Sequence, residues 1–130
     1  MIVIDASAIC AIVLGEPERE SFTAAIIESQ RALVAPIQVW EAAVTITQRT
    51  ALDGLGEVDR LRARLAVEIA TLGESETRLA FNAWRTFGKG RHPAQLNLGD
   101  CFSYALAKSR DLPLLFKGED FAMTDIRSAF

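Results

Sequence analysis

The sequence predicts an α/β fold: one domain over residues 1–130, with a small, four- or five-stranded parallel sheet flanked by helices. Short apolar runs rich in β-branched residues alternate along the chain with longer segments of helical periodicity. Strands separated by helices run parallel, with helices on both faces of the sheet. The chain has 130 residues, of which 50% are hydrophobic, so one domain can bury a substantial core.

Each expected strand is a short apolar run that ends at a residue unsuited to a strand interior. Asp5 ends the first run, and Pro36 ends the second. The third run also fits an extension of the helix before it. In chain order, the expected strands are residues 1–4, 32–35, 67–72 and 112–116.

The expected helices have apolar periodicity, an end signal, or both. Gly15 ends the first helix, Pro17 suits the first turn of the second, and the glycines of residues 54–56 separate the third from the fourth. Ser75 and Asn97 are suitable caps for the last two. The expected helices are residues 6–14, 17–30, 37–51, 57–65, 75–87 and 98–109, followed by a helical turn at 118–121.

The composition favours a cytoplasmic protein with no membrane association. No apolar run is long enough to span a bilayer, and no basic residue precedes Asp5 as a signal peptide would require. Cys10 and Cys101 lie far apart, as expected for buried free thiols in a reducing compartment. The net charge of −3 argues against binding nucleic acid by overall charge, but leaves room for a local basic patch. Trp40, Phe102 and Tyr104 are expected in the core.

Four acids fall where the carboxyl ends of the strands meet. Asp5 ends the first strand, Glu41 lies one turn into the helix after the second, and Asp120 follows the fourth. Asp100 lies in the first turn of the helix that leads into the fourth strand. Ligands of open parallel sheets bind at this edge. We therefore expect the four carboxylates to point toward one site.

Each acid also has a simpler interpretation. Asp5 suits an N-cap, and Asp100, three residues after Asn97, suits a capping box. Asp120 would complement a helix dipole, and Glu41 would pair with Arg49 or another base. Taken together, however, four acids without matched bases repel one another, and a divalent cation removes that conflict. Oxygen ligands without a His or Cys cluster favour Mg²⁺ or Mn²⁺ over Zn²⁺. Carboxylate-held Mg²⁺ most often serves phosphoryl chemistry, and in the absence of a Gly-rich phosphate loop the simplest use is hydrolysis of a phosphodiester.

Four segments, in order, resemble PIN-domain ribonucleases, and more narrowly the VapC toxins of VapBC toxin–antitoxin modules. The resemblance covers essentially the whole chain. The segments are Ile-Val-Ile-Asp-Ala-Ser-Ala (2–8), Trp40-Glu41, Leu-Gly-Asp-Cys-Phe-Ser-Tyr-Ala-Leu-Ala (98–107), and Leu-Leu-Phe-Lys-Gly-Glu-Asp-Phe (114–121) followed by Thr-Asp-Ile (124–126).

The resemblance implies a Mg²⁺-dependent endoribonuclease toxin that hydrolyses RNA with a metal-activated water, with Mn²⁺ able to substitute. It identifies Asp5 and Asp100 as direct metal ligands, with Glu41 and Asp120 completing the site directly or through water. Ser7 matches a small hydroxyl residue that supports the site, although a helix cap explains it equally well. Asp125 is expected to have a structural role. Glu119, next to Asp120, is the other candidate for the fourth acid.

Substrate and partner predictions rest on the one dense basic stretch and on the resemblance. Arg85, Lys89, Arg91 and His92, with Lys117 nearby, are expected RNA-phosphate contacts, or else a solvated loop. The resemblance implies a homodimer that binds the C-terminal segment of a VapB antitoxin, forming a heterotetramer or larger assembly.

Two other functions fit the sequence less well. A haloacid-dehalogenase-like phosphatase with Asp5 as nucleophile needs a second acid two residues later, where this chain has Ser7. A receiver domain needs an acceptor Asp at the end of the third strand, where this chain has Gly73 and Glu74.

Overall fold

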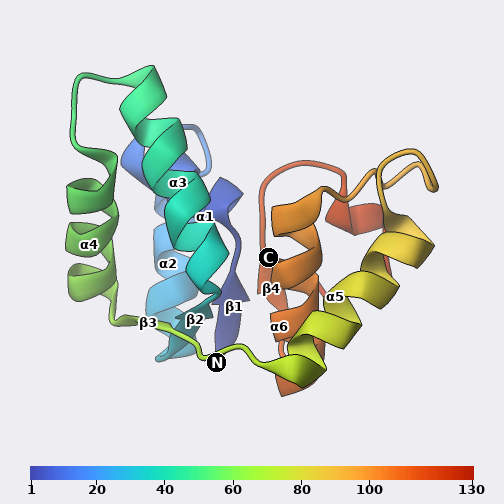
Figure 1. Cartoon of the computed structure of the whole chain (residues 1–130). Coiled ribbons are helices and arrows are strands. Elements are labelled where there is room, and N and C mark those ends of the chain that lie inside the picture. The colour runs from blue at the N-terminus through green and yellow to red at the C-terminus, as the bar shows by residue number, and fades with distance from the viewer.

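The computed structural model describes all of residues 1–130 and has a four-stranded parallel sheet between two layers of helices (Figure 1). Its strands are β1 (Ile2–Ile4), β2 (Ala32–Val34), β3 (Val67–Ile69) and β4 (Leu114–Leu115), in the spatial order β3-β2-β1-β4. The predicted fold class is confirmed, and the ambiguous third run is a strand. Because β1 pairs with both β2 and β4, its carboxyl end lies between those of two neighbouring strands, at the edge of the sheet where the strands end.

The helices begin at slightly different places from those expected. They are α1 (Ala6–Val13), α2 (Arg19–Ser29), α3 (Pro36–Arg49), α4 (Gly54–Leu65), α5 (Glu74–Phe87) and α6 (Leu98–Arg110), and a 3₁₀ helix η1 (Phe121–Met123) follows β4. Pro17 precedes α2 instead of opening it, and Gly73 instead of Ser75 caps α5. Gly54 was expected in the break between the third and fourth helices, but it is the first residue of α4. A side chain there would overlap the Ala43 carbonyl, so the glycine permits close packing of α4 on α3.

Alternate strand residues face two hydrophobic clusters, one on each side of the sheet. Ile2 and Ile4 pack with residues of α1 to α4, whereas Val3 and Leu33 pack with residues of α5 and α6. Figure 1 shows the first group of helices in blue to green and the second in yellow to orange. This arrangement confirms the expectation of helices on both faces.

Side-chain burial departs from expectation at Trp40, which is 64% exposed, so the prediction that it lies in the core is wrong. On α3 the core is contacted by Val39, Ala42 and Ile46, and Trp40 lies on a different side of the helix. Tyr104 is buried as predicted, and Phe102 is half-buried.

The two cysteines are buried free thiols, as predicted. Burial is the main cause that raises the pKa of both Cys10 and Cys101 to about 11. None of the helices combines the length and apolar composition that crossing a bilayer requires.

Candidate functional site

Asp5 is held in place by neutral donors. It is only 4% exposed, directly after β1. Its Oδ2 accepts hydrogen bonds from the Ser7 backbone N–H (3.0 Å) and hydroxyl (2.7 Å), and its Oδ1 accepts one from the Ser103 hydroxyl (2.6 Å). The predicted N-cap is therefore present, but capping uses only one of the two carboxylate oxygens. No Lys or Arg forms an ion pair with Asp5.

Asp100 combines a structural role with an unusual electrostatic environment. Its Oδ2 accepts a hydrogen bond from the Asn97 N–H (3.0 Å), and the Asn97 side chain accepts one from the Asp100 N–H (2.9 Å), which confirms the predicted capping box. The pKa of Asp100 is raised to about 7, first by burial and then by the charges of Asp5, Asp120 and Glu41. The hydrogen bond from Asn97 opposes this rise.

Glu41 projects from α3 against the beginning of α6. A side chain at Gly99 would overlap the Glu41 carboxylate, so the glycine makes the space that this carboxylate occupies. Burial, and next the charge of Asp5, raises the pKa of Glu41. The alternative pairing of Glu41 with Arg49 is absent, because Arg49 forms no ion pair in the structure.

The four predicted acids lie close enough together for the charges of Asp5, Asp120 and Glu41 to raise the pKa of Asp100. Asp120 is exposed, opens η1 and makes no side-chain hydrogen bond. No three His, Cys, Asp or Glu side chains are arranged to hold a metal ion as they stand. By chemistry the set nevertheless fits a hard divalent cation, since it consists of carboxylate oxygens that repel one another and have no basic partner.

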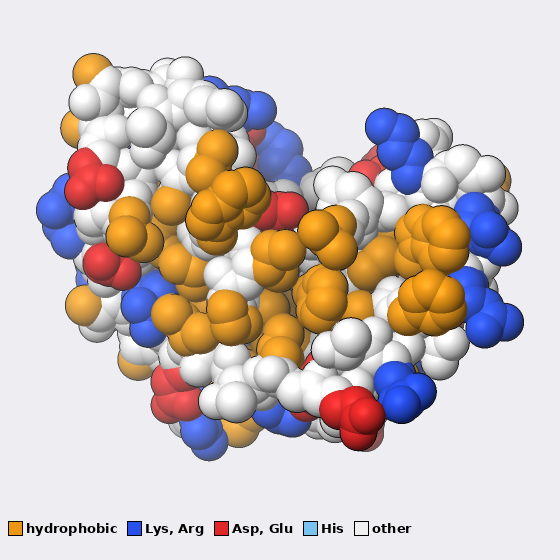
Figure 2. All heavy atoms as spheres, viewed as in Figure 1, with side chains coloured by type: hydrophobic (Ala, Val, Ile, Leu, Met, Phe, Trp, Pro, Cys, Tyr) orange, Lys and Arg blue, Asp and Glu red, His pale blue; other side chains and the backbone are white.

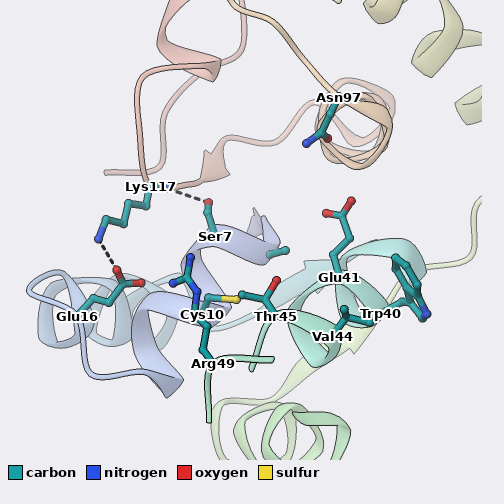
Figure 3. A pocket seen from close by; sticks show the side chains of 11 residues that line it. Ser7, Cys10, Glu16, Trp40, Glu41, Val44, Thr45, Arg49, Asn97 and Lys117 are labelled. Carbon is teal, nitrogen blue, oxygen red and sulfur yellow. Dashed lines mark hydrogen bonds and ion pairs between the residues drawn. The ribbon is translucent and has the colours of Figure 1, made fainter. Parts of the chain in front are cut away.

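A pocket of about 560 Å³ opens beside these acids (Figure 3). Glu41 and Asn97 lie at one end, and Lys117, Glu16 and Arg49 lie toward the other. Asp5 is buried next to Ala6 and Ser7, which line the pocket. The Ser7 hydroxyl also accepts a hydrogen bond from the Lys117 backbone N–H (3.0 Å), so it joins the segment after β4 to the Asp5 carboxylate.

The predicted RNA contacts differ in how free their charges are. Lys117 forms ion pairs with Glu16 (2.7 Å) and Glu18 (3.3 Å), which occupy its ammonium group. The guanidinium of Arg91 stacks on Trp84 (4.9 Å to the ring centre), and its Nε donates to the carbonyl of Arg85 (3.2 Å).

The remaining residues of the basic stretch, with Asp125, have these surroundings. His92 accepts a hydrogen bond from the Ala94 N–H at Nδ1 (3.0 Å), which orders the loop. Lys89 lines a mostly apolar pocket with Trp84 and Leu96. Asp125 accepts from the Tyr104 hydroxyl (2.6 Å) and pairs with Lys108 (2.8 Å), in agreement with a structural role.

The sequence does not point to Ser103 or Gln38, and it suggests Arg49 only as a partner for Glu41. The buried Ser103 hydroxyl bonds Asp5, the buried Gln38 amide joins three helices, and Arg49 lines the pocket without a carboxylate partner. Ser103 and Gln38 carry no charge and no motif, so only their burial in an apolar core distinguishes them from surface polar residues. Arg49 lies eight residues after Glu41, and this spacing places both residues on similar sides of a helix. Their presence in one pocket could therefore have been predicted from the sequence.

The PIN-domain family model matches residues 2–126, nearly the whole chain. The chain belongs to the PIN-domain family. Among its relatives, the ribonuclease VapC30 of Mycobacterium tuberculosis is 45% identical over 124 residues, with 95% of each chain covered. A ribonuclease VapC of Mycolicibacterium smegmatis is 41% identical over 124 residues, covering 95% of this chain and 96% of the other. Within the PIN-domain family, this chain is therefore of the VapC type.

Solved structures agree on the PIN fold. The crystal structure of Mycobacterium tuberculosis VapC20, described as a toxin that cleaves the sarcin–ricin loop, superposes with a TM-score of 0.75 at 13% identity, covering 97% of this chain and 96% of that one. A toxin–antitoxin complex from Klebsiella pneumoniae superposes with a TM-score of 0.70 at 16% identity, covering 100% and 98% of the two chains. At these identities the likeness concerns the fold.

The raised pKa of Asp100 predicts how the stability of the metal-free PIN domain depends on pH. In the folded state Asp100 binds a proton below about pH 7, whereas in the unfolded chain it does so only below its ordinary value of 3.8. The folded state therefore holds the extra proton between these values, and stability falls as the pH rises through this window. Asp100→Asn keeps the acceptor for Asn97 and removes the charge.

We expect Asp100→Asn to raise the melting temperature at pH 8 in EDTA by about 4 °C, which corresponds to roughly 1 kcal/mol in a domain of this size. The gain should shrink toward zero near pH 4. Thermal unfolding across this pH range measures it, with Glu28→Gln on α2 as the matched control. An equal gain at pH 4 and pH 8 would contradict the repulsion among the acids.

Gly99 separates the placement of Glu41 from the stability of the fold. In Gly99→Ala the new methyl group would displace the Glu41 carboxylate, the flexible end of a side chain, while alanine favours the helix by about 0.5–1 kcal/mol. We expect a melting temperature close to that of the parent and RNA cleavage reduced by roughly tenfold or more, as for loss of a positioning contact. Gly56→Ala, in the first turn of α4, is the matched control and should leave cleavage unchanged. Parental cleavage by Gly99→Ala would show that Glu41 does not act from this position.

Proposed function

We propose that the chain is a Mg²⁺-dependent endoribonuclease toxin of a type II toxin–antitoxin system, with a metal site formed by Asp5, Glu41, Asp100 and Asp120. The observation that carries this proposal is the burial of Asp5 and half-burial of Glu41 and Asp100 at one edge of the sheet, with no basic side chain paired to any of the four acids. The charges of the other three acids also raise the pKa of Asp100. A divalent cation relieves that repulsion. Mn²⁺ accepts the same oxygen ligands and should substitute.

Each acid has a distinct place in the proposed site. Asp5 and Asp100 are the direct ligands, and Glu41 and Asp120 complete the coordination directly or through water. Ser7 and Ser103 hold the Asp5 carboxylate in one orientation through both of its oxygens. When bound, Mg²⁺ would polarise the RNA phosphate and lower the pKa of the water that attacks it. Asp120 is preferred to Glu119 as the fourth acid because its charge is among those that raise the pKa of Asp100.

RNA would reach these acids along the positively charged parts of their surroundings. Arg85, Lys89, Arg91 and His92 remain the proposed phosphate contacts, since Arg and Lys offset the repulsion between RNA and an acidic site. Lys117 contributes less charge, because Glu16 and Glu18 pair with it. Arg49 has no such partner and lines the pocket that contains Glu41.

Protein partners form the last part of the proposal. We propose a homodimer that binds a VapB-type antitoxin, in a heterotetramer or larger assembly. Figure 2 shows apolar side chains spread over the face formed by α3, α5 and the start of α6. Exposed apolar surface of this kind is typical of protein interfaces. Among its residues, Trp40 is 64% exposed, Phe81 56% and Leu98 68%.

Metal-dependent RNA cleavage by the purified protein tests this function. EDTA should abolish cleavage, Mg²⁺ or Mn²⁺ should restore it, and Ca²⁺ should support little turnover because its larger radius and looser geometry position the oxygens less well. Asp5→Asn keeps the helix cap, because Asn caps as well as Asp, but removes a charged ligand. Its cleavage rate should fall by about 100-fold or more.

The control for Asp5→Asn is Glu119→Gln, which changes an exposed acid beside Asp120 and should cost roughly tenfold or less. Undiminished cleavage in EDTA would rule out the carboxylate–metal mechanism. A parental rate for Asp5→Asn at saturating Mg²⁺ would show that the site lies elsewhere.

A further inference from the structure

Gln38 is a buried polar side chain to which neither the motifs nor the predicted site assigns a role. It lies in the first turn of α3 and is fully buried, at 0% exposed. Its Oε1 accepts a hydrogen bond from the Ala6 N–H (2.8 Å), and its Nε2 donates one to the Gly99 carbonyl (2.6 Å). Because one partner is a donor and the other an acceptor, only this orientation of the amide satisfies both.

The two partners of Gln38 are each one residue from a proposed metal ligand. Ala6 follows Asp5 at the start of α1, and Gly99 precedes Asp100 at the start of α6. Glu41 comes three residues after Gln38 on α3, and its carboxylate lies against Gly99. A single side chain therefore joins the three helix starts that carry three of the four acids.

These contacts fasten the starts of α1, α3 and α6 to one another, in addition to the Ser103–Asp5 hydrogen bond that joins α6 to the start of α1. The Ala6 N–H is in the first turn of α1, where backbone donors have no partner within the helix. Asp5 caps Ser7, so Gln38 supplies the acceptor that Ala6 lacks. On α6, the Gly99 carbonyl accepts a hydrogen bond from the Gln38 amide, and the Gly99 Cα faces the Glu41 carboxylate. On α3 the two contacting residues, Gln38 and Glu41, lie about one helical turn apart, and both meet Gly99 of α6. These contacts fix the spacing of the two helices at this point.

We propose that Gln38 is a positioning residue that sets the separation of Asp5, Glu41 and Asp100 and thereby the affinity of their site for a divalent cation. This inference rests on the proposed function. Gln38 does not touch the reacting atoms. It acts through the backbone at Ala6, which directly follows Asp5, and at Gly99, which directly precedes Asp100.

Two substitutions separate the reach of the side chain from its hydrogen bonds. Gln38→Met keeps nearly the same length but makes neither hydrogen bond. Gln38→Asn keeps the amide but is one methylene shorter, so it cannot span from Ala6 to Gly99. Val58→Ala is the control, because it truncates a fully buried core residue of α4 without touching these contacts.

The measurement is Mn²⁺ binding by isothermal titration calorimetry in the absence of RNA, with thermal unfolding and the Mg²⁺ dependence of RNA cleavage recorded for the same samples. Both Gln38 variants should bind Mn²⁺ at least tenfold more weakly and need correspondingly more Mg²⁺ for half-maximal cleavage. Val58→Ala should bind Mn²⁺ as the parent does, even though its melting temperature falls. A purely structural Gln38 would lower the melting temperature alone.

The possible failures are distinguishable. If the parent binds Mn²⁺ and both Gln38 variants bind it equally well, the inference is wrong and the proposed function stands. If the parent itself neither binds Mn²⁺ nor cleaves RNA, the proposed function is wrong and the inference falls with it.

Discussion

The repulsion among four carboxylates at one edge of a parallel sheet is the constraint around which this part of the molecule is built. The central strand β1 delivers Asp5 to that edge, and the starts of α3 and α6 deliver Glu41 and Asp100. No lysine or arginine forms an ion pair with these acids. Of the two basic residues that line the pocket, Lys117 pairs with Glu16, and Arg49 forms no ion pair. Neutral donors hold Asp5 and Asp100 instead, which keeps the charges of these two acids available to a cation.

The same acids that are proposed to bind metal also begin helices. Asp5 caps α1 and Asp100 closes the capping box of α6. The negative end groups are thus placed at helix N-termini, where the helix dipole stabilises them and partly offsets their mutual repulsion. Because asparagine also caps helices, this double use makes it a suitable replacement for testing Asp5 and Asp100.

Much of the fold and the charged part of the site could be predicted from the sequence. The strands are apolar β-branched runs, and the caps at Asp5 and Asn97 have side chains of the expected type. Asp5 and Asp120 follow strands, whereas Glu41 and Asp100 lie near the starts of helices. What could not be predicted depends on packing between distant segments. Gln38 bonds partners 32 and 61 residues away, and Ser103 bonds Asp5 from 98 residues away, so no local pattern reveals either contact. The prediction that Trp40 lies in the core was wrong because an isolated tryptophan does not indicate which face of its helix packs on the sheet.

The most direct test of this account is anomalous diffraction from crystals grown with Mn²⁺, which locates the ion without reference to activity. We expect an anomalous peak between the carboxylates of Asp5 and Asp100, with those side chains and Glu41 drawn closer together than in crystals grown with EDTA. The absence of a peak at saturating Mn²⁺, or a peak only at other acids such as Glu16 and Glu18, would contradict the claim that the four carboxylates form a metal site.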